Sequence, residues 1–495
     1  MTFEHVDHEL IRRIGAFADE NKVELYLVGG AVRDQILGRN SKDIDFTVVG
    51  DAVSFVQKLS VVLKSGSPVI FEKFGTAMLP YRDGNLEFVG TRKEVYDPSS
   101  RKPVISTGTL EDDLARRDFT CNAMAVCVNH DRFGELIDPY NGREAIERKL
   151  LTTPLDPEKT FSDDPLRMMR ACRFAAQLDF EIDAKIQESI RAMASRISIV
   201  SIERIRDELI KILESRKPSI GLDHLYSLGL LQHFFPELHA LAGVDQRKIE
   251  TAEGVINHHH KDVFYHTLLV VDNIAEVTDN LWLRLSALLH DIAKPQTKHF
   301  DAESGWSFHG HEIIGARAVK IIFQNLRLPM EPIRYVQKLV ALHLRPIALA
   351  NEEVTDSAIR RLLFDAGEDI DDLIVLCRAD ITSKNPAKVN KYLENYRRVV
   401  ERMLAVEEKD RLRNWQPPLR GDEIMALCGI GEGAMVGVLK TKIEDAILDG
   451  IIANDREEAI QYLHTIKDDI LAREIITKPL PAKRKLKSLP TNLSS

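Results

Sequence analysis

Residues 25–48 read Leu-Tyr-Leu-Val-Gly-Gly-Ala-Val-Arg-Asp-Gln-Ile-Leu-Gly-Arg-Asn-Ser-Lys-Asp-Ile-Asp-Phe-Thr-Val. The apolar run at 25–28 is typical of a buried strand, and it ends at Gly29-Gly30. Glycine has no Cβ and lets the backbone approach a ligand closely, and the amides that open a helix suit phosphate groups. This stretch therefore predicts a strand, a phosphate-binding turn, a short helix closed by Gly38, and a second strand.

Two aspartates, Asp43 and Asp45, stand at the start of the second expected strand. Residues i and i+2 of a strand point to one face, so their carboxylates should project side by side while Ile44 faces the core. Such a pair suits Mg²⁺ together with substrate phosphates, and two metals can hold both oxygens of an in-line displacement. Two surface acids beside a plain turn are the alternative, but the glycine turn nearby favours nucleotidyl transfer from a nucleoside triphosphate.

This segment resembles motif A of the class II nucleotidyltransferases, the family of tRNA CCA-adding enzymes and bacterial poly(A) polymerases. In that family the two aspartates bind catalytic metal ions. The resemblance implies an α+β, polymerase-β-like nucleotidyltransferase head with a small mixed sheet, followed by a mostly α-helical neck, an HD domain and a tail. Glu87, on a later expected strand, is either a third metal carboxylate or an exposed strand acid.

Composition sets the frame for this interpretation. The chain has 495 residues, which suggests about three domains, and its hydrophobic content of 44% supports real cores. The net charge of −9 argues against a wholly basic nucleic-acid binder, although a local basic path remains compatible with it. The five cysteines form no CxxC pair, and no signal peptide or membrane-spanning run is visible, so we expect a cytoplasmic protein.

Further elements follow around the first motif. Residues 90–110 are polar and rich in turn formers, so they predict a long loop. In the family resembled, a flexible loop in this region is needed to switch from adding C to adding A. The expected helices here are 1–22 and 52–63, and the expected strands are 68–71, 75–79 and 86–89.

Residues 116–123 read Arg-Arg-Asp-Phe-Thr-Cys-Asn-Ala. Arginines present fixed donors that suit a triphosphate, and Asn122 suits a ribose; a helix N-terminus with a local Arg–Asp pair is the alternative. The run resembles motif B of the family, which implies nucleotide binding by Arg116, Arg117, Asp118 and Asn122. Gly29, Gly30 and Arg33 would join them, and residues 137–142 resemble motif C, a hinge.

Residues 161–178 predict one helix with Ser162 at its N-cap and Pro165 in its first turn. Asp164 and Arg167 would share a face at i and i+3, either as an intrahelical ion pair or as a reader of an incoming base. The carboxylate accepts and the guanidinium donates, which complements the amino group and ring nitrogen of C and A and rejects G and U.

This stretch resembles motif D, which reads the incoming base, although Asp163 stands where the family usually has Glu. Arg170 and Arg173 would contact the triphosphate or face solvent. Residues 201–213 predict an amphipathic helix that starts at a capping Ser and resembles motif E, usually a structural neck helix.

A second region is rich in histidine. His266, His290-Asp291 and Asp380 resemble the first metal site of an HD phosphohydrolase domain, and His311 and His343 resemble the extra ligands of two-metal variants. Imidazole and carboxylate ligands suit Ni, Mn, Fe, Zn or Mg, and a degenerate scaffold kept for its shape is the alternative. His258–His260 and His309 match no ligand position and are predicted surface residues.

The end of the chain is predicted to be helical with a basic, disordered tail. A charged helix at 388–413 and glycine-punctuated short helices at 419–450 precede that tail. The expected domains are a head at 1–137, a neck with base-recognition and RNA-binding residues at 138–250, an HD domain at 251–400, a tRNA-binding region at 401–475 and the tail at 476–495.

Together these features predict an enzyme that adds CCA to tRNA from CTP and ATP, with Mg²⁺ and without a template. The partners would be tRNA, CTP and ATP, with no DNA and no membrane, in a monomer or homodimer. The alternatives are a poly(A) polymerase that uses only ATP, an HD phosphohydrolase with an RNA-binding head, and a noncatalytic RNA-binding protein. Addition of CC alone or of A alone stays open, as do the activity and metal of the HD domain.

Overall fold

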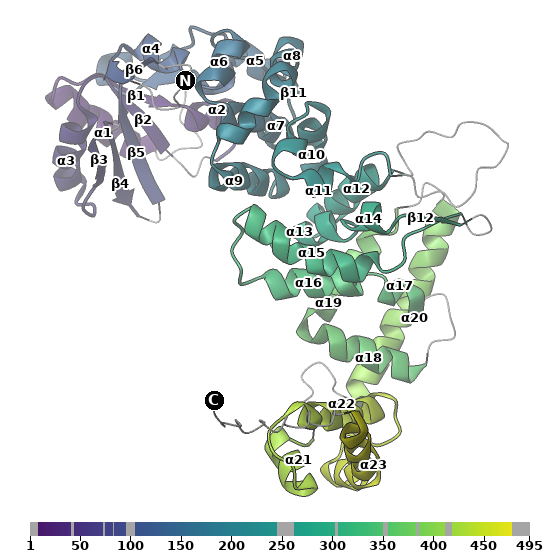
Figure 1. Ribbon diagram of the computed structural model, residues 1–495. Helices are drawn as coiled ribbons and strands as arrows, with labels where there is room; N and C mark the ends of the chain where they lie inside the picture. Colours follow the sequence, from purple (N-terminus) through teal and green to yellow (C-terminus); the bar gives the residue numbers. More distant parts are fainter. Residues whose placement is uncertain are drawn as a thin grey trace, which may run out of the picture. The chain divides into compact units, whose positions relative to one another are not determined.

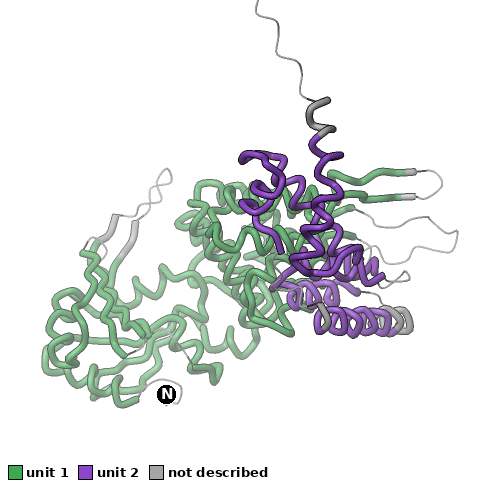
Figure 2. Tube along the Cα trace, turned by 90° about the horizontal axis from the view of Figure 1, so that it is seen from below, with its two compact units in different colours: residues 1–341 green, residues 342–495 purple. Residues whose placement is uncertain are grey.

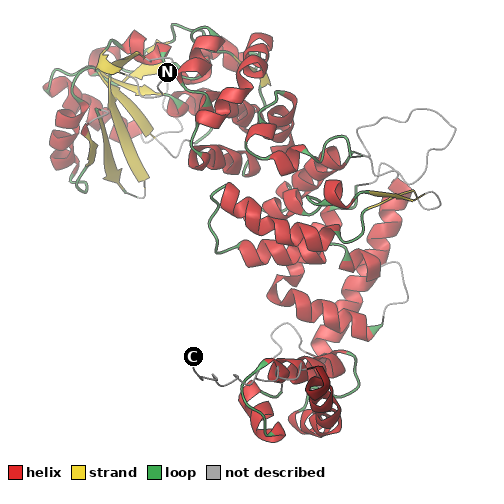
Figure 3. Cartoon of the chain, viewed as in Figure 1, coloured by secondary structure: helices red, strands yellow, loops and turns green. Residues whose placement is uncertain are grey.

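The computed structural model describes residues 8–40, 44–72, 75–82, 84–95, 104–244, 262–301, 305–349, 355–382, 386–410 and 418–477. The chain divides into two compact units, residues 1–341 and 342–495 (Figure 2). Figure 3 shows that the large sheet belongs to the N-terminal part of the first unit and that helices dominate the rest of the chain. The predicted order, an α+β head followed by a mostly helical chain, is confirmed.

A seven-stranded mixed sheet forms the head, in the order β3-β4-β5-β2-β1-β8-β9 (Figure 1). Strand β1 lies inside the sheet between β2 and β8, and all four of its residues are buried, as its apolar run predicted. The strands are β1 (Leu25–Val28), β2 (Ile44–Val48), β3 (Val69–Phe71), β4 (Thr76–Tyr81), β5 (Gly84–Gly90), β8 (Ala125–Cys127) and β9 (Leu136–Ile137).

The helices at residues 8–20, 30–36 and 52–63 form where the sequence predicted helices, whereas the helix at 110–115 was not predicted. Helix α1 (His8–Glu20) buries Leu10, Ile11, Ile14 and Phe17 on one stripe. Helix α3 (Ala52–Leu63) begins at Asp51, whose carboxylate accepts a hydrogen bond from the Ser54 N–H. The remaining helices of the head are α2 (Gly30–Ile36) and α4 (Leu110–Ala115), and a 3₁₀ turn covers Thr120–Asn122.

The prediction of an irregular loop at 90–110 is wrong in part. Two antiparallel strands, β6 (Arg92–Val95) and β7 (Val104–Thr107), pair across this segment. The polar, turn-rich composition gives no sign of these strands, because they are stabilised by backbone hydrogen bonds across the pair. Residues 96–103 between them lie outside the described residues, so the predicted role in switching from C to A stays a prediction.

The expected single helix at 161–178 is instead two helices, α6 (Pro157–Asp163) and α7 (Leu166–Leu178). Ser162 lies inside α6 rather than at an N-cap. Pro165 has no N–H and disfavours helical geometry in the residue before it, and Asp164 adopts φ −142° and ψ 103°. Asp164 is thereby displaced from the face of α7 that carries Arg167.

The neck is a bundle around α7, which buries ten of its thirteen residues. Helix α10 comes close to α7 and α9 at Gly221, where a Cβ would lie 2.8 Å from Ile212 Cγ2 and 3.1 Å from the Cys172 carbonyl oxygen. The neck elements are α5 (Gly142–Glu147), β10 (Leu150–Leu151), β11 (Glu181–Ile182), α8 (Ala184–Met193), α9 (Ile202–Leu213), α10 (Pro218–Ser227) and α11 (Pro236–His239).

A second helical layer of the first unit follows the neck and is joined to it by Arg284. This side chain is 2% exposed, and its guanidinium donates to the carbonyl oxygens of Leu213 at 2.7 Å, Ser215 at 3.1 Å and Thr278 at 2.9 Å. The elements are α12 (Val263–Ala275), α13 (Leu281–Leu289), α14 (Lys294–Thr297), β12 (His299–Asp301), β13 (Gly305–Ser307), α15 (His311–Asn325) and α16 (Ile333–Leu342).

The second unit is helical throughout its described residues. Its last three helices enclose a core that includes Leu419, Ile424, Leu439 and Leu463. The helices are α17 (Arg345–Leu349), α18 (Asp356–Ala366), α19 (Ile370–Ala379), α20 (Pro386–Asp410), α21 (Gly421–Cys428), α22 (Ala434–Leu448) and α23 (Arg456–Thr477). The predicted basic tail lies outside the described residues.

No helix in the described part of the chain combines the length and apolar composition that a membrane crossing requires. All five cysteines lie in that part, and each is a free thiol.

Candidate active site

A cavity of about 700 Å³ opens in the first unit between the head and the neck helices. Both glycines of the turn after β1 line it, and so do seven arginines and four aspartates. This excess of cations suits a polyphosphate. The charged lining residues are Arg33, Asp34, Asp45, Arg116, Arg117, Asp118, Asp164, Arg167, Arg170, Arg173 and Arg204.

The floor of the cavity is the turn between β1 and α2. Gly29 has φ +69°, and a Cβ there would lie 3.0 Å from Arg117 Nη1 and 3.6 Å from Asp45 Oδ2. Gly30 opens helix α2, so its backbone faces the cavity. Only glycine combines this dihedral angle with room for both side chains; the sequence predicted the close approach but not the dihedral angle.

Asp45 lines the same cavity beside the glycine turn. On the neighbouring parallel strand, Glu87 pairs directly with Asp45 in the sheet register. Partners in register project to the same face, so the two carboxylates form a donor set that suits a hard cation such as Mg²⁺. Asp43 lies outside the described residues, and its metal role stays a prediction.

Arg116 and Arg117 share one buried anion, Asp113, which precedes them on helix α4. Arg117 Nη2 lies 3.1 Å from Asp113 Oδ2, and Arg116 Nη2 lies 2.5 Å from Asp113 Oδ1. Burial opposes the charge of Asp113, but the two arginines together hold its pKa below the usual range. A fixed carboxylate therefore orients both guanidinium groups at the cavity wall.

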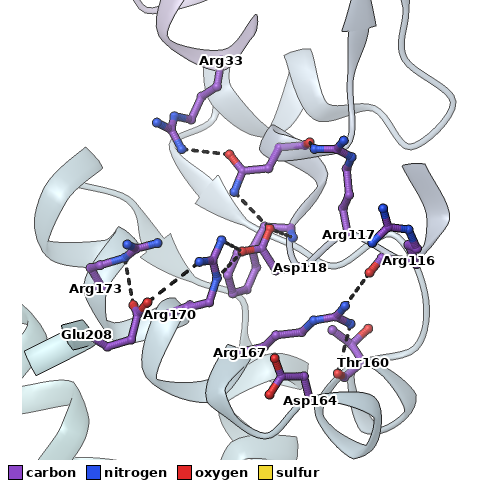
Figure 4. Close-up of polar contacts among 12 residues, drawn as sticks. Arg33, Arg116, Arg117, Asp118, Thr160, Asp164, Arg167, Arg170, Arg173 and Glu208 are labelled. Carbon is purple, nitrogen blue, oxygen red and sulfur yellow. Dashed lines mark hydrogen bonds and ion pairs between the residues drawn. The ribbon is translucent and has the colours of Figure 1, made fainter. Parts of the chain in front are cut away.

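Asp118 is the hub of the polar network in Figure 4. Its Oδ2 accepts from Arg170 Nε at 2.7 Å, and its Oδ1 accepts from the Asn122 amide at 3.0 Å. Asn122 in turn accepts from Arg33 at 2.8 Å. Burial opposes ionisation of Asp118, but Arg170, Asn122 and Arg167 outweigh it and hold its pKa well below the usual range. The network thus joins motif-B residues to arginines from α2 and α7.

Asp164 and Arg167 both line the cavity, but they are not paired with each other. Asp164 Oδ2 lies 2.7 Å from Arg204 Nη2 of helix α9. Arg167 donates to the carbonyl oxygens of Arg116 at 2.5 Å and Thr160 at 3.3 Å (Figure 4). The predicted pairing of Asp164 with Arg167 within one helix is therefore wrong, because Pro165 separates Asp164 from helix α7, which carries Arg167.

Arg173 does not face solvent, so of the two predicted alternatives, contact with the triphosphate or exposure to solvent, the second is wrong for this residue. Its side chain is 8% exposed, and Nε lies 3.1 Å from Glu208 Oε2. Burial and the neighbouring Arg170 lower the pKa of Arg173 to about 10, so it remains a cation at neutral pH. Arg170 lies 3.8 Å from Glu208 as well, so one carboxylate of α9 supports both arginines.

A second candidate site surrounds Asp291 at the end of α13. His290 Nε2 and His311 Nε2 each lie 3.2 Å from the Asp291 carboxylate, His266 Nε2 lies 3.6 Å away and Lys294 Nζ 2.6 Å away. Burial opposes the charge of Asp291, but His290 and Lys294 hold its pKa well below the usual range.

The ring orientations of two histidines suit a metal. The Nδ1 of His290 lies 2.7 Å from the Ala287 carbonyl oxygen, and the Nδ1 of His311 lies 2.7 Å from that of Phe308. A backbone acceptor at one ring nitrogen directs the other nitrogen to the centre, as in protein metal sites. His266 and His290 offer ligand nitrogens within 4.8 Å of each other.

The other two predicted ligands belong to the second unit. His343 is 1% exposed, and its carbonyl oxygen accepts from the Cys377 thiol at 3.0 Å. Asp380 follows the last residue of α19. Of the histidines predicted to be surface residues, His309 is exposed, and His258–His260 lie outside the described residues.

Three family models match the chain. Residues 25–152 match the "Poly A polymerase head domain", residues 179–241 the "Probable RNA and SrmB- binding site of polymerase A", and residues 263–385 the "HD domain". These ranges contain the glycine turn, helix α9 and the histidine-rich region in turn.

Similarity to characterised proteins extends over most of the chain. An A-adding tRNA nucleotidyltransferase of Deinococcus radiodurans is 31% identical over 440 residues, which cover 87% of this chain and 93% of that protein. The chain belongs to the tRNA nucleotidyltransferase family. A CC-adding tRNA nucleotidyltransferase of Thermus thermophilus is 29% identical and covers 89% of this chain and 93% of its own. As a member of this family, the chain is a transferase.

Solved structures share the fold. "The structure of CCA-adding enzyme apo form II" superposes with a TM-score of 0.61 at 24% identity, and it covers 93% of this chain and 97% of its own. A Thermotoga maritima CCA-adding enzyme with tRNA has a TM-score of 0.57 at 22% identity over 93% and 96% of the two chains. These likenesses agree with a nucleotidyltransferase head followed by helical domains.

Four supporting residues of this tRNA nucleotidyltransferase escaped sequence reasoning: Asp113, Arg204, Glu208 and Arg284. Each is a charged residue within a helix, where a solvated face is the ordinary expectation. For Glu208, the position on the buried side of an amphipathic helix was a usable signal, since an acid among Ile205, Leu209 and Ile212 requires a partner.

Proposed function

We propose that this enzyme completes tRNA 3′ ends by adding C, C and A from CTP and ATP without a nucleic-acid template. The observation that carries the proposal is the cavity in which the Gly29-Gly30 turn and Asp45 meet seven arginines. The similarity to full-length tRNA nucleotidyltransferases supports tRNA as the acceptor. The free thiols of the cysteines fit a reducing cytoplasm, where these substrates occur.

Asp43, Asp45 and Glu87 would hold Mg²⁺ at the start of β2. Bound there, Mg²⁺ would offset charge on the phosphates and favour the 3′-hydroxyl of tRNA as nucleophile. The amide-rich turn at Gly29-Gly30 and the Arg116/Arg117 pair would bind the triphosphate. The 3′-hydroxyl oxygen then bonds to the α-phosphorus, and pyrophosphate leaves.

Asp164 and Arg167 would choose the base. Their present partners, the Arg204 side chain and two backbone carbonyl oxygens, occupy the groups that a cytosine or adenine edge would contact. Base binding therefore exchanges protein partners for the amino group and ring nitrogen of the base. The discrimination arises because G and U would place a ring N–H against the Arg167 donors and a carbonyl oxygen against the Asp164 acceptors.

Addition of A alone is the second candidate, because the Deinococcus relative, 93% of whose length aligns with this chain, is an A-adding enzyme. Relatives named multifunctional CCA protein, such as that of Herminiimonas arsenicoxydans at 33% identity, match 62% of this chain and 70% of their own. The two candidate functions differ in the tRNA 3′ end that is extended: one that lacks CCA, or one that already ends in CC.

The test supplies labelled CTP and ATP, separately and together, to tRNA that lacks its terminal CCA and to tRNA that ends in CC. Complete CCA on the first acceptor supports our proposal, whereas extension of only the CC-ended acceptor supports A addition. Asp45→Asn is the inactive control, and the proposal fails if this variant adds nucleotides at the rate of the wild type.

We propose in addition that the HD region is a metal-dependent phosphohydrolase. In the first unit, His266, His290, Asp291 and His311 would hold one or two ions, of Ni, Mn, Fe, Zn or Mg, and His343 and Asp380 stay ligands predicted from the sequence. The metal would polarise a phosphate ester and activate water. Asp291→Asn should abolish release of phosphate and leave CCA addition intact, and Asp45→Asn should do the reverse.

A further inference from the structure

One face of the outer strands β5, β4 and β3 is accessible at the edge of the large sheet. The alternate residues of β4 and β5 that face helix α3 are buried, and the Phe88 ring lies 5.9 Å from the ring of Phe55 on that helix (Figure 1). On the opposite face, Val69 is 44% exposed, Phe71 is 45% exposed and Met78 is half-buried. We call these three residues the outer face. Accessible apolar side chains that gather on one surface mark an interaction site.

The sheet register places the outer face in line with Asp45. Asp45 pairs with Glu87 across the sheet. Glu87 pairs with Met78, and Met78 pairs with Val69. Paired residues project to the same face and neighbouring strands are about 4.7–4.9 Å apart, so Met78 lies about 10 Å from Asp45. Phe71 projects to this face as well, because it follows Val69 by two residues.

The groups that suit the triphosphate lie on the other side of Asp45. The glycine turn follows β1, and Arg117 Nη1 lies 3.5 Å from the carbonyl oxygen of Asn122, which precedes β8. In the sheet, β1 and β8 lie on one side of β2, and β5, β4 and β3 lie on the other. Of the residues that the structure describes, Asp45 lines the arginine-rich cavity, whereas Glu87 and the outer face do not.

In-line displacement gives this strand order a direction of approach. The attacking and leaving oxygens lie on opposite sides of the phosphorus in such a reaction. With the pyrophosphate toward β1 and the arginines, the attacking 3′-hydroxyl reaches the α-phosphate from the side of β5. The nucleotide that carries this hydroxyl then lies over β5, β4 and β3, where the outer face is accessible.

We propose that the outer face holds the 3′-terminal base of the acceptor tRNA, while the 3′-hydroxyl of the same nucleotide lies beside Glu87. This inference rests on the proposed nucleotidyl transfer and names Met78 and Phe71 as positioning residues for it. An aromatic ring and a thioether contact any base, since every base has a π-face. Such tolerance suits an acceptor whose last base changes during the additions, whereas Asp164 and Arg167 would select the incoming base.

The first test maps the acceptor end directly. A tRNA that lacks CCA and ends in 4-thiouridine is bound to the full-length protein with Mg²⁺, with and without a nonhydrolysable CTP analogue. After irradiation and digestion, mass spectrometry identifies the crosslinked peptides. We expect crosslinks to peptides that contain Phe71 or Met78, and crosslinks confined to other segments overturn the proposal.

The second test measures the single-turnover rate of C addition at saturating tRNA and CTP. For Phe71→Ser and Met78→Ser we expect this rate to fall about tenfold, from loss of the surface on which one base stacks, while Kd for CTP without tRNA stays unchanged. Phe71→Tyr keeps the ring and should match wild type. Val61→Ser is the matched control that should also match wild type, because it removes a 77% exposed apolar side chain from helix α3, which covers the other face.

Two kinetic results contradict the proposal. One is C addition at the wild-type rate by either serine variant of the outer face. The other is a parallel loss of CTP affinity, since that pattern indicates general damage to the head. If wild type adds no nucleotide to any tRNA acceptor, the proposed function fails, while the crosslinking experiment still decides where the acceptor end lies.

Discussion

Replacement of Asp118 by Asn removes one charge from the centre of the cavity network while keeping the size of the side chain. Asp118 accepts from Arg170, from Asn122 and from the Phe119 N–H at 2.8 Å. The amide of Asn offers one acceptor oxygen and turns a donor toward these donors. Breaking a buried ion pair from one side costs about 3–5 kcal/mol.

We expect the lower end of that range, about 3 kcal/mol, for Asp118→Asn. Arg170 is 32% exposed and keeps Glu208 at 3.8 Å, so its charge is not stranded. Glu147→Gln is the matched control, because it removes an exposed i, i+4 pair with Arg143 and should cost no more than about 0.5 kcal/mol.

The pH dependence gives an independent check on the same variant. Since the pKa of Asp118 is lowered by folding, its stabilisation is present above the unfolded pKa of about 3.9 and is lost as pH falls toward the folded value. The difference in free energy of unfolding between wild type and Asp118→Asn should therefore be constant from pH 7 to about pH 5 and shrink below about pH 4.

Urea unfolding read by pulsed hydrogen exchange of α7 peptides separates the first unit from the second. A difference below about 1 kcal/mol at pH 7 would contradict the assignment of Asp118 as an ionised hub. A difference that stays the same at low pH would show that the loss is steric rather than electrostatic.

Three further predictions follow from other residues. Gly29→Ala should raise KM for CTP and ATP about tenfold or more, through strain of about 1–3 kcal/mol and crowding of Arg117, while circular dichroism stays unchanged. Arg204→Ala should reduce the preference for CTP over UTP in kcat/KM about tenfold, because Asp164 loses the charge-assisted bond that positions its carboxylate before a base exchanges with Arg204. Arg206→Ala, whose partners are Asp207 and a backbone carbonyl, should not have this effect. Arg284→Met should destabilise the first unit by about 3 kcal/mol in the urea assay, since carbonyl oxygens of the neck lose their donor, and an unchanged midpoint would refute that role.

The sequence by itself determined the features that depend on neighbours in the chain. The run at 25–30 predicted a buried strand and a turn in which glycine lets other groups approach the backbone closely, and β1 and Gly29 have these features. The linear pattern also predicted helices over 1–22 and 52–63, where α1 and α3 form. Strand alternation and helical periodicity are local geometry, so a linear pattern records them.

Only the tertiary structure decided which charged groups meet. Asp164 pairs with Arg204, forty residues away, rather than with Arg167 three residues away. Asp113 and Glu208 support the arginines of the cavity, and Arg284 joins the neck to the next helical layer. The sequence pattern does not distinguish a helix charge that faces water from one that faces another helix. The partner of a buried charge is selected by the packing of distant segments and by the cost of burying that charge alone.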